Sequence, residues 1–252
     1  MTQASKQGDF LAQFYNSHQI SEETIEYFRS QPWLRRSLLP KPKRRVGNRD
    51  PATSSTATTT SIIATPFTGE TLTQPLQFRY LKDTGEDFFF ARTLATPTTI
   101  PHMLCLNHRT VATLPETPAG TIMPANDWRS PTQVPEKPDC IFLINLAGPA
   151  IDGHPHICHG GVIASILDEA IGLVTMLHTQ SADSLREPFY TVNLNVTYRA
   201  PVTTPSDVIV RCWLKARQGR KWVALGQFVD KDGVVLCEGQ GTWVLAKKRE
   251  NL

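Results

Sequence analysis

The sequence lacks the features of several large classes of protein. No uninterrupted apolar run approaches the roughly 18–20 residues of a bilayer-spanning helix, so we expect no membrane span. The N-terminal residues lack the basic segment and apolar core of a secretory signal. Five cysteines in 252 residues include no Cys-x-x-Cys pair, which favours reduced thiols over a disulfide scaffold. We therefore predict an intracellular protein, placed in the cytoplasm unless it is directed to mitochondria.

Several catalytic and cofactor motifs are also missing. The sequence has no Gly-x-Ser-x-Gly, no P-loop and no Gly-x-Gly-x-x-Gly, which disfavours serine hydrolases, nucleotide hydrolases and dinucleotide-binding enzymes. His154, His156 and His159 lie close together, but their spacing matches no helical zinc motif and no nearby cysteine completes a ligand set. We predict neither a metal nor a bound cofactor.

Acidic residues are missing from one basic segment. Seven basic residues and no acidic one lie between Arg35 and Arg49, whereas the rest of the chain holds 19 basic and 23 acidic residues. Such a segment can bind an anionic partner, but it is more often a solvated linker. We favour the linker and predict no nucleic-acid partner.

The chain divides into a small N-terminal part and a main domain. Ser21 has the side chain of a helix N-cap, two glutamates follow it, and Ile25 and Phe28 give the next residues an apolar side. These features predict a short helix. The stretch after it is rich in Pro, Lys, Arg, Ser and Thr and has little to bury. We assign the helix and linker to residues 1–60 and the main domain to residues 61–252.

The first part of the main domain has β-rich and proline-rich segments. Residues 76–81 and 88–94 are separated by Asp-Thr-Gly-Glu-Asp, which has turn chemistry, so the pattern predicts a hairpin. A proline-rich stretch over 114–138 predicts a long loop or insertion, which we interpret as a lid.

One strongly helical segment follows, over residues 160–178, with apolar residues at helical spacing. Its other face carries small residues and one carboxylate: Gly161, Ala164, Ser165, Asp168, Gly172 and Thr175. Four strand patterns come next, over residues 191–198, 208–217, 221–229 and 234–245. One long helix beside an antiparallel meander predicts an α+β fold.

The helix start concentrates groups that can carry chemistry. Gly160 and Gly161 follow His159, and their N–H groups lie at the positive end of the helix dipole. Such groups suit a carbonyl oxygen that acquires negative charge. The alternative is that the glycines only permit a tight turn into the helix.

Asp168 is the second candidate, seven residues after Gly161. At ~1.5 Å per residue the two lie ~10 Å apart along the helix axis, so one helix cannot present both to one carbonyl carbon. If both act in one site, they come from different subunits, which predicts a two-fold dimer with two shared sites. The alternative for Asp168 is a capping or solvated carboxylate.

Three segments resemble the hotdog-fold thioesterases, and in particular the THEM-type acyl-coenzyme A thioesterases and their fungal relatives. The first segment, residues 153–170, reads GHPHICHGG followed by VIASILDEA. The second, residues 191–201, reads TVNLNVTYRAP, and the third, residues 218–222, reads QGRKW. The resemblance covers about residues 140–245. One departure is Gly153, where several hotdog thioesterases have Asn or a similar polar residue.

The resemblance implies a hotdog fold, in which a curved antiparallel β-sheet wraps a long central helix. It places Asp168 at the catalytic carboxylate and Thr191 at the catalytic hydroxyl. It further implies acyl-coenzyme A or acyl-carrier-protein thioesters as substrates, with coenzyme A as part of the substrate, in lipid or polyketide metabolism. A homodimer, or a tetramer of such dimers, is the expected assembly.

The expected mechanism holds the thioester carbonyl with the Gly161 N–H, assisted by Gly160 or His159. Asp168 of the partner then acts as general base or nucleophile, and Thr191 orients it or the water. Two alternatives remain open. One is a hotdog enzyme of a biosynthetic pathway that dehydrates, cyclises or releases a carrier-bound acyl chain without hydrolysis. The other is a non-enzymatic binding protein on the same fold.

Overall fold

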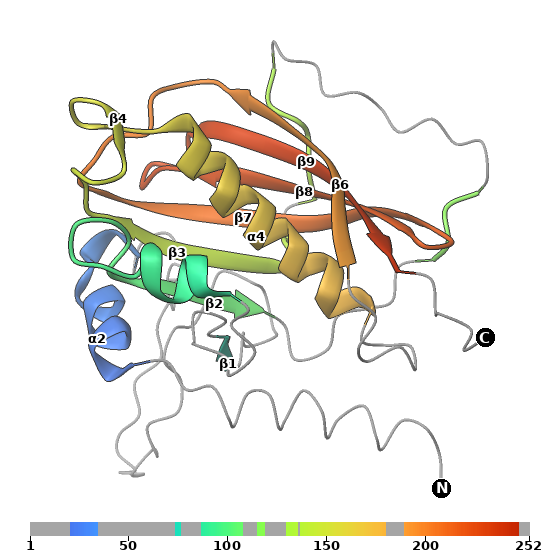
Figure 1. Cartoon of the computed structure of the whole chain (residues 1–252), viewed down its shortest axis with the longest axis horizontal. Coiled ribbons are helices and arrows are strands. Elements are labelled where there is room, and N and C mark those ends of the chain that lie inside the picture. Colours follow the sequence, from blue (N-terminus) through green and yellow to red (C-terminus); the bar gives the residue numbers. More distant parts are fainter. Residues whose placement is uncertain are drawn as a thin grey trace, which may run out of the picture.

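A seven-stranded antiparallel sheet with one long helix across a face makes up most of the molecule (Figure 1). The computed structural model describes residues 21–34, 74–76, 87–107, 115–118, 130–135, 137–179 and 189–246. The order in the sheet is β1-β2-β3-β7-β8-β9-β6, and every pair of neighbours is antiparallel. The predicted α+β architecture is therefore confirmed.

The bounds of the elements agree with the prediction from residue 160 onward. The helices are α2 (Glu22–Ser30), the short π-helix η1 (Phe89–Thr93) and α4 (Gly160–Thr179). The strands of the large sheet are β1 (Gln74–Leu76), β2 (Met103–Asn107), β3 (Cys140–Leu146), β6 (Phe189–Tyr198), β7 (Ser206–Gln218), β8 (Lys221–Val229) and β9 (Val235–Leu245). A small hairpin, β4 (Asp152–His154) with β5 (Ile157–Cys158), precedes α4.

Helix α4 packs its apolar side into the sheet. Ile166, Leu167 and Ile171 are fully buried. A Cβ added to Gly226 of β8 or Gly239 of β9 would lie 3.1 Å from the Leu167 side chain, so both glycines let the helix approach closely. By length and composition α4 could cross a bilayer. Because its apolar residues pack on the sheet, we identify it as a core helix.

The opposite face of the sheet is covered as well, by α2. Alternate residues of β3 belong to different cores: Phe142 packs with α4, and Leu143 packs with Phe28 of α2. The predicted cap is present, since Ser21 Oγ accepts a hydrogen bond from the N–H of Thr24 at 3.3 Å. The Tyr27 hydroxyl donates to Asp207 Oδ1 at 2.8 Å and ties α2 to β7. We call the sheet face beneath α2 the outer face.

Part of the proline-rich insertion also lies on the outer face. Trp213 Nε1 donates to the carbonyl oxygens of Pro135 and Lys137 at 3.1 and 3.0 Å. The N–H of Thr117 donates to the Arg217 carbonyl at 2.6 Å. These described portions thus contact the outer face at Trp213 and the backbone of β7 at Arg217, and the lid remains a prediction.

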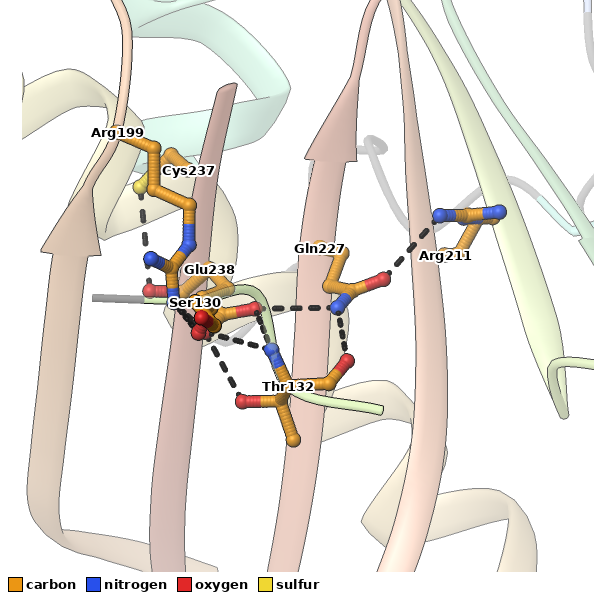
Figure 2. Close-up of polar contacts among 7 residues, drawn as sticks. All are labelled: Ser130, Thr132, Arg199, Arg211, Gln227, Cys237 and Glu238. Carbon is orange, nitrogen blue, oxygen red and sulfur yellow. Dashed lines mark hydrogen bonds and ion pairs between the residues drawn. The ribbon is translucent and has the colours of Figure 1, made fainter. Parts of the chain in front are cut away.

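A buried carboxylate on the outer face holds residues 130–132 of the insertion (Figure 2). The Glu238 side chain is 0% exposed and is ion-paired with Arg199. Thr132 donates to Glu238 through its N–H at 2.9 Å and its hydroxyl at 2.9 Å, and Gln227 Nε2 donates at 3.1 Å. Burial alone would raise the pKa of Glu238, but these hydrogen bonds, that of Arg199 foremost, hold the pKa below its ordinary value. The carboxylate therefore stays ionised inside the protein.

The predicted hairpin over 76–81 and 88–94 is wrong in its second arm. Residues 89–93 are helical, with the N–H of Ala91 bonded to the Asp87 carbonyl at 2.8 Å. Phe90 and Leu94 are buried four residues apart, which is helical spacing, so packing overrides the β propensity of the aromatic run. Most of the first arm, residues 77–81, lies outside the described residues. So do the basic segment over 35–49 and the proposed boundary at residues 60–61.

Candidate active site

The start of α4 is built by the β4–β5 hairpin. Asp152 accepts hydrogen bonds from the Thr204 hydroxyl at 2.5 Å and from the N–H of His156 at 3.2 Å. His156 has a φ of 63°, in the left-handed region that a tight turn requires. These contacts fix the turn that places His159 immediately before the helix.

His159 caps the helix with its own side chain. Its Nδ1 accepts a hydrogen bond from the N–H of Gly161 at 2.9 Å, and its carbonyl accepts from Val162 and Ile163. Because Nδ1 is an acceptor here, the ring proton of the neutral imidazole lies on Nε2. The Gly161 N–H, predicted to hold the substrate carbonyl, is therefore occupied by the histidine in this structure.

Both glycines of the motif lie close to neighbouring side chains. A Cβ on Gly161 would lie 3.0 Å from His159 Nδ1, and a Cβ on Gly160 would lie 3.2 Å from the Tyr198 hydroxyl oxygen. That hydroxyl donates to the Gly160 carbonyl at 2.7 Å, a contact that the sequence did not reveal. Among the described residues, the N–H of Gly160 has no hydrogen-bond partner. Gly160 thus presents the N–H that a ligand oxygen can use.

Gly153, the departure from the family pattern, also has a steric reason. A Cβ at this position would lie 3.0 Å from His159 Cδ2 and 3.1 Å from its Cα. A side chain here would push the capping histidine. The turn of this chain is therefore built around a glycine instead of a polar side chain.

Asp168 and Thr191 meet, as the resemblance implies. The Thr191 hydroxyl of β6 donates to Asp168 Oδ1 of α4 at 3.0 Å. Asp168 is half-buried, and burial raises the pKa of its carboxyl group, while the hydrogen bond from Thr191 opposes that rise. A carboxylate that is partly desolvated and oriented by a hydroxyl is suited to act as a general base or nucleophile.

A bulge in β6 places Thr191 in this position. Thr191 pairs with Trp243 of β9, and Asn193 pairs with the very next residue, Thr242, so Val192 is the extra residue. The bulge puts Thr191 on the same face as Leu194, which packs into the core beneath α4. Val192 is 59% exposed, as expected of a bulged residue. Without the bulge, Thr191 would lie on the face of Asn193.

The structure does not bring every predicted group together. Gly160 and Asp168 are eight residues apart on one straight helix, which is ~12 Å along its axis. His154 and His156 lie exposed on the β4–β5 hairpin. Among the described residues, no group of three His, Cys, Asp or Glu side chains is placed to hold a metal ion.

Comparison with known proteins gives a family match for part of the chain. Residues 156–237, which include α4 and strands β6 to β8, match the family model of the thioesterase superfamily. The match and the topology of the sheet confirm the resemblance to hotdog-fold thioesterases. Residues 156–237 therefore resemble a thioesterase-superfamily domain, and the described sheet and helix have the arrangement of a hotdog fold.

Two curated relatives are similar to parts of the chain. Acyl-coenzyme A thioesterase THEM4 of Bos taurus is 32% identical over 82 residues, which is 32% of this chain and 29% of THEM4. The uncharacterized mitochondrial membrane protein FMP10 of Saccharomyces cerevisiae is 24% identical over 117 residues, 46% of this chain and 45% of FMP10. The matched part is thus less than half the length of each relative.

Solved structures that are similar to part of the chain include two bacterial proteins. One, from Bacillus halodurans, was solved with coenzyme A; it is 21% identical with a TM-score of 0.36, over 42% of this chain and 66% of that chain. The other is the E. coli PaaI protein from the phenylacetic acid degradation operon, 13% identical with a TM-score of 0.36, over 43% of this chain and 72% of that chain.

Proposed function

We propose that this protein hydrolyses acyl thioesters, of coenzyme A or of an acyl carrier protein, to a free acid and a thiol. The observation that carries the proposal is the 3.0 Å hydrogen bond from Thr191 to Asp168, which unites a helix carboxylate with a strand hydroxyl. Membership of the matched segment in the thioesterase superfamily supports the same reaction.

In this proposal Asp168 is the group that reacts. Burial makes its carboxylate more basic than an exposed aspartate, and Thr191 holds Oδ1 so that Oδ2 can take a proton from water or attack the carbonyl carbon. A thiolate is a good leaving group, so one carboxylate and a polarised carbonyl suffice without a serine nucleophile.

The thioester carbonyl is polarised at the start of α4. The Gly161 N–H is bonded to His159, so we assign the donor role to the Gly160 N–H at the positive end of the helix dipole. Tyr198 supports this residue by its hydrogen bond to the Gly160 carbonyl. This assignment differs from the sequence-based expectation, which gave Gly161 the main role.

A homodimer would complete the site. Since Gly160 and Asp168 of one helix are ~12 Å apart, the carbonyl at Asp168 must contact Gly160 of a second copy. β6 is the edge strand of the described sheet, and its Tyr190 and Val192 are 60% and 59% exposed. Pairing of β6 with its two-fold copy would bury these side chains and bring the two helices together.

Thiol release tests the proposal. Purified protein is incubated with acyl-coenzyme A thioesters of several chain lengths and with an acyl carrier protein thioester, and free thiol is measured. We expect release by wild type and by the control Asp232→Asn, whose carboxylate is exposed on the β8–β9 turn, and its loss in Asp168→Asn. Undiminished release by Asp168→Asn would refute the role of Asp168.

Product identification by mass spectrometry separates the alternatives. Free acid and free thiol are the expected products. An acyl product that is dehydrated or cyclised, without hydrolysis, would favour the biosynthetic hotdog enzyme instead. Absence of any product, together with binding of an acidic partner, would favour the non-enzymatic binding protein.

A further inference from the structure

A row of four side chains crosses the sheet on the face covered by α4. Thr191 of β6 pairs with Trp243 of β9, Trp243 pairs with Trp222 of β8, and Trp222 pairs with Arg217 of β7. Directly paired residues of antiparallel strands present their side chains on one face. The hydroxyl that contacts Asp168 is therefore the first member of a row whose next two members are indoles.

The Trp243 indole fills the space next to the catalytic pair. It is 3% exposed. A Cβ added to Gly241 would lie 2.2 Å from its ring, so the indole lies directly over that glycine. A Cβ added to Gly172 of α4 would lie 3.6 Å from the indole Nε1. Gly172 is one helical turn beyond Asp168, or ~6 Å along the axis, so the ring closes the gap between helix and sheet at that distance.

Trp222 closes the row behind Trp243. Its indole is 4% exposed, and the Arg217 guanidinium carbon lies 5.1 Å from the centre of its ring. Among the described residues, the Trp222 Nε1 has no hydrogen-bond partner, so packing holds the ring in place. Two aromatic side chains thus stand one behind the other on the line that leads inward from Thr191.

We propose that Trp243 limits the length of the acyl group and that the substrates are thioesters of short acyl chains, such as butyryl and hexanoyl. This inference rests on the proposed thioesterase function. The reacting carbonyl must lie at Asp168, and an acyl chain gains binding energy only in apolar surroundings. The Trp243 indole pairs with Thr191 across the strands and lies against Gly172, about one helical turn from Asp168, so it stands directly behind the reacting groups. A longer chain would have to displace a ring that packs against Gly172 and Gly241.

The test compares chain-length profiles of wild type and Trp243→Leu. We measure kcat/KM for acetyl-, butyryl-, hexanoyl-, octanoyl- and lauroyl-coenzyme A. For wild type we expect a decline beyond hexanoyl. In Trp243→Leu the ratio of lauroyl to butyryl kcat/KM should rise at least about tenfold, since one methylene that fits or fails to fit an apolar pocket changes kcat/KM about 10–200-fold.

Trp213→Leu is the matched control. Trp213 is equally buried at 3%, but its Nε1 bonds to Pro135 and Lys137 on the outer face. It loses the same indole and should keep the wild-type chain-length ratio. Trp243→Phe gives a milder version of the test if Trp243→Leu fails to fold, which circular dichroism and thermal melting would reveal.

The outcomes distinguish the two proposals. Two outcomes would overturn the role of Trp243 and leave the thioesterase function standing. In one, wild type and both Trp243 variants turn over thioesters with the same lauroyl-to-butyryl ratio of kcat/KM. In the other, wild type turns over lauroyl- and butyryl-coenzyme A equally. An equal shift in Trp213→Leu would also overturn it. No turnover of any thioester by wild type would overturn the thioesterase function itself and this inference with it.

Discussion

Replacing Glu238 with glutamine should lower the stability of the protein strongly. The change removes a buried negative charge while keeping the shape of the side chain, and it leaves the Arg199 guanidinium facing a neutral amide. Loss of one partner of a buried ion pair costs about 3–5 kcal/mol. In a domain of this size each kcal/mol lowers the melting temperature by about 2–4 °C. We therefore expect Glu238→Gln to melt about 6–20 °C below wild type in a thermal unfolding assay followed by circular dichroism.

The same carboxylate should make stability depend on pH. Because the folded protein holds the pKa of Glu238 below the ordinary value of 4.5, its contribution to the free energy of unfolding is fully present above that value. It is lost as the pH falls through the lower, folded pKa. Urea unfolding between about pH 3 and pH 7 should show a stability loss at the acid end that is weaker in Glu238→Gln.

Two variants separate the charge from the rest of the network. Thr132→Ala removes one hydroxyl donor but keeps the backbone N–H, so it should cost about 1 kcal/mol. Combining Glu238→Leu with Arg199→Met removes both charges and should recover much of the loss. A Glu238→Gln protein that melts within about 2 °C of wild type, which is less than about 1 kcal/mol, would refute the reasoning.

Three further predictions concern the site. Asp168→Asn should reduce kcat/KM by about 10²–10⁴-fold without lowering the melting temperature at pH 7. Folding raises the pKa of Asp168, so the contribution of this group to stability is lost as the pH rises through that pKa. A variant that melts below wild type at pH 7 would contradict this. Thr191→Val removes a hydrogen bond to a charged group and should reduce kcat/KM about 10–100-fold; unchanged kinetics would show that Asp168 is oriented otherwise. Val192→Arg should dissociate the proposed dimer in light scattering and abolish turnover, whereas Val234→Arg, at a position 53% exposed on the β8–β9 turn, should change neither; loss of the dimer in both would argue against the β6 interface.

The second half of the fold could be predicted because its periodicities are strong. The helical spacing of apolar residues gave α4 within one residue of its observed end. Alternation and turn residues gave β7, β8 and β9. The elements of the first half could not be predicted in this way, because they are short and depend on partners distant in the sequence. β2 was missed, since a five-residue strand buried on both faces shows no alternation.

The candidate site was predicted by a mixture of routes. Strict alternation along β6 would have put Thr191 on the polar face with Asn193, and only the resemblance to a family pointed to it. The bulge at Val192 places Thr191 on the face of α4, which alternation alone does not predict. The hydrogen bond from Gly161 to the His159 ring could not be predicted, because it depends on a side-chain conformation within the turn. The insertion's contacts with the outer face depend on pairings about 76–106 residues apart in sequence.

The packing of α2 on the outer face shows that the segment recognised by similarity to other proteins is shorter than the segment whose residues share one core. The family match covers residues 156–237, yet the core beneath α2 is shared among Phe28, Leu104, Leu143 and Ile209, three of which precede that segment. A fragment cut to the matched residues would lose β2 and β3 and expose both apolar faces of the remaining sheet. We therefore expect a stably folding fragment to include α2, β2 and β3, which lie outside the part that the family model matches.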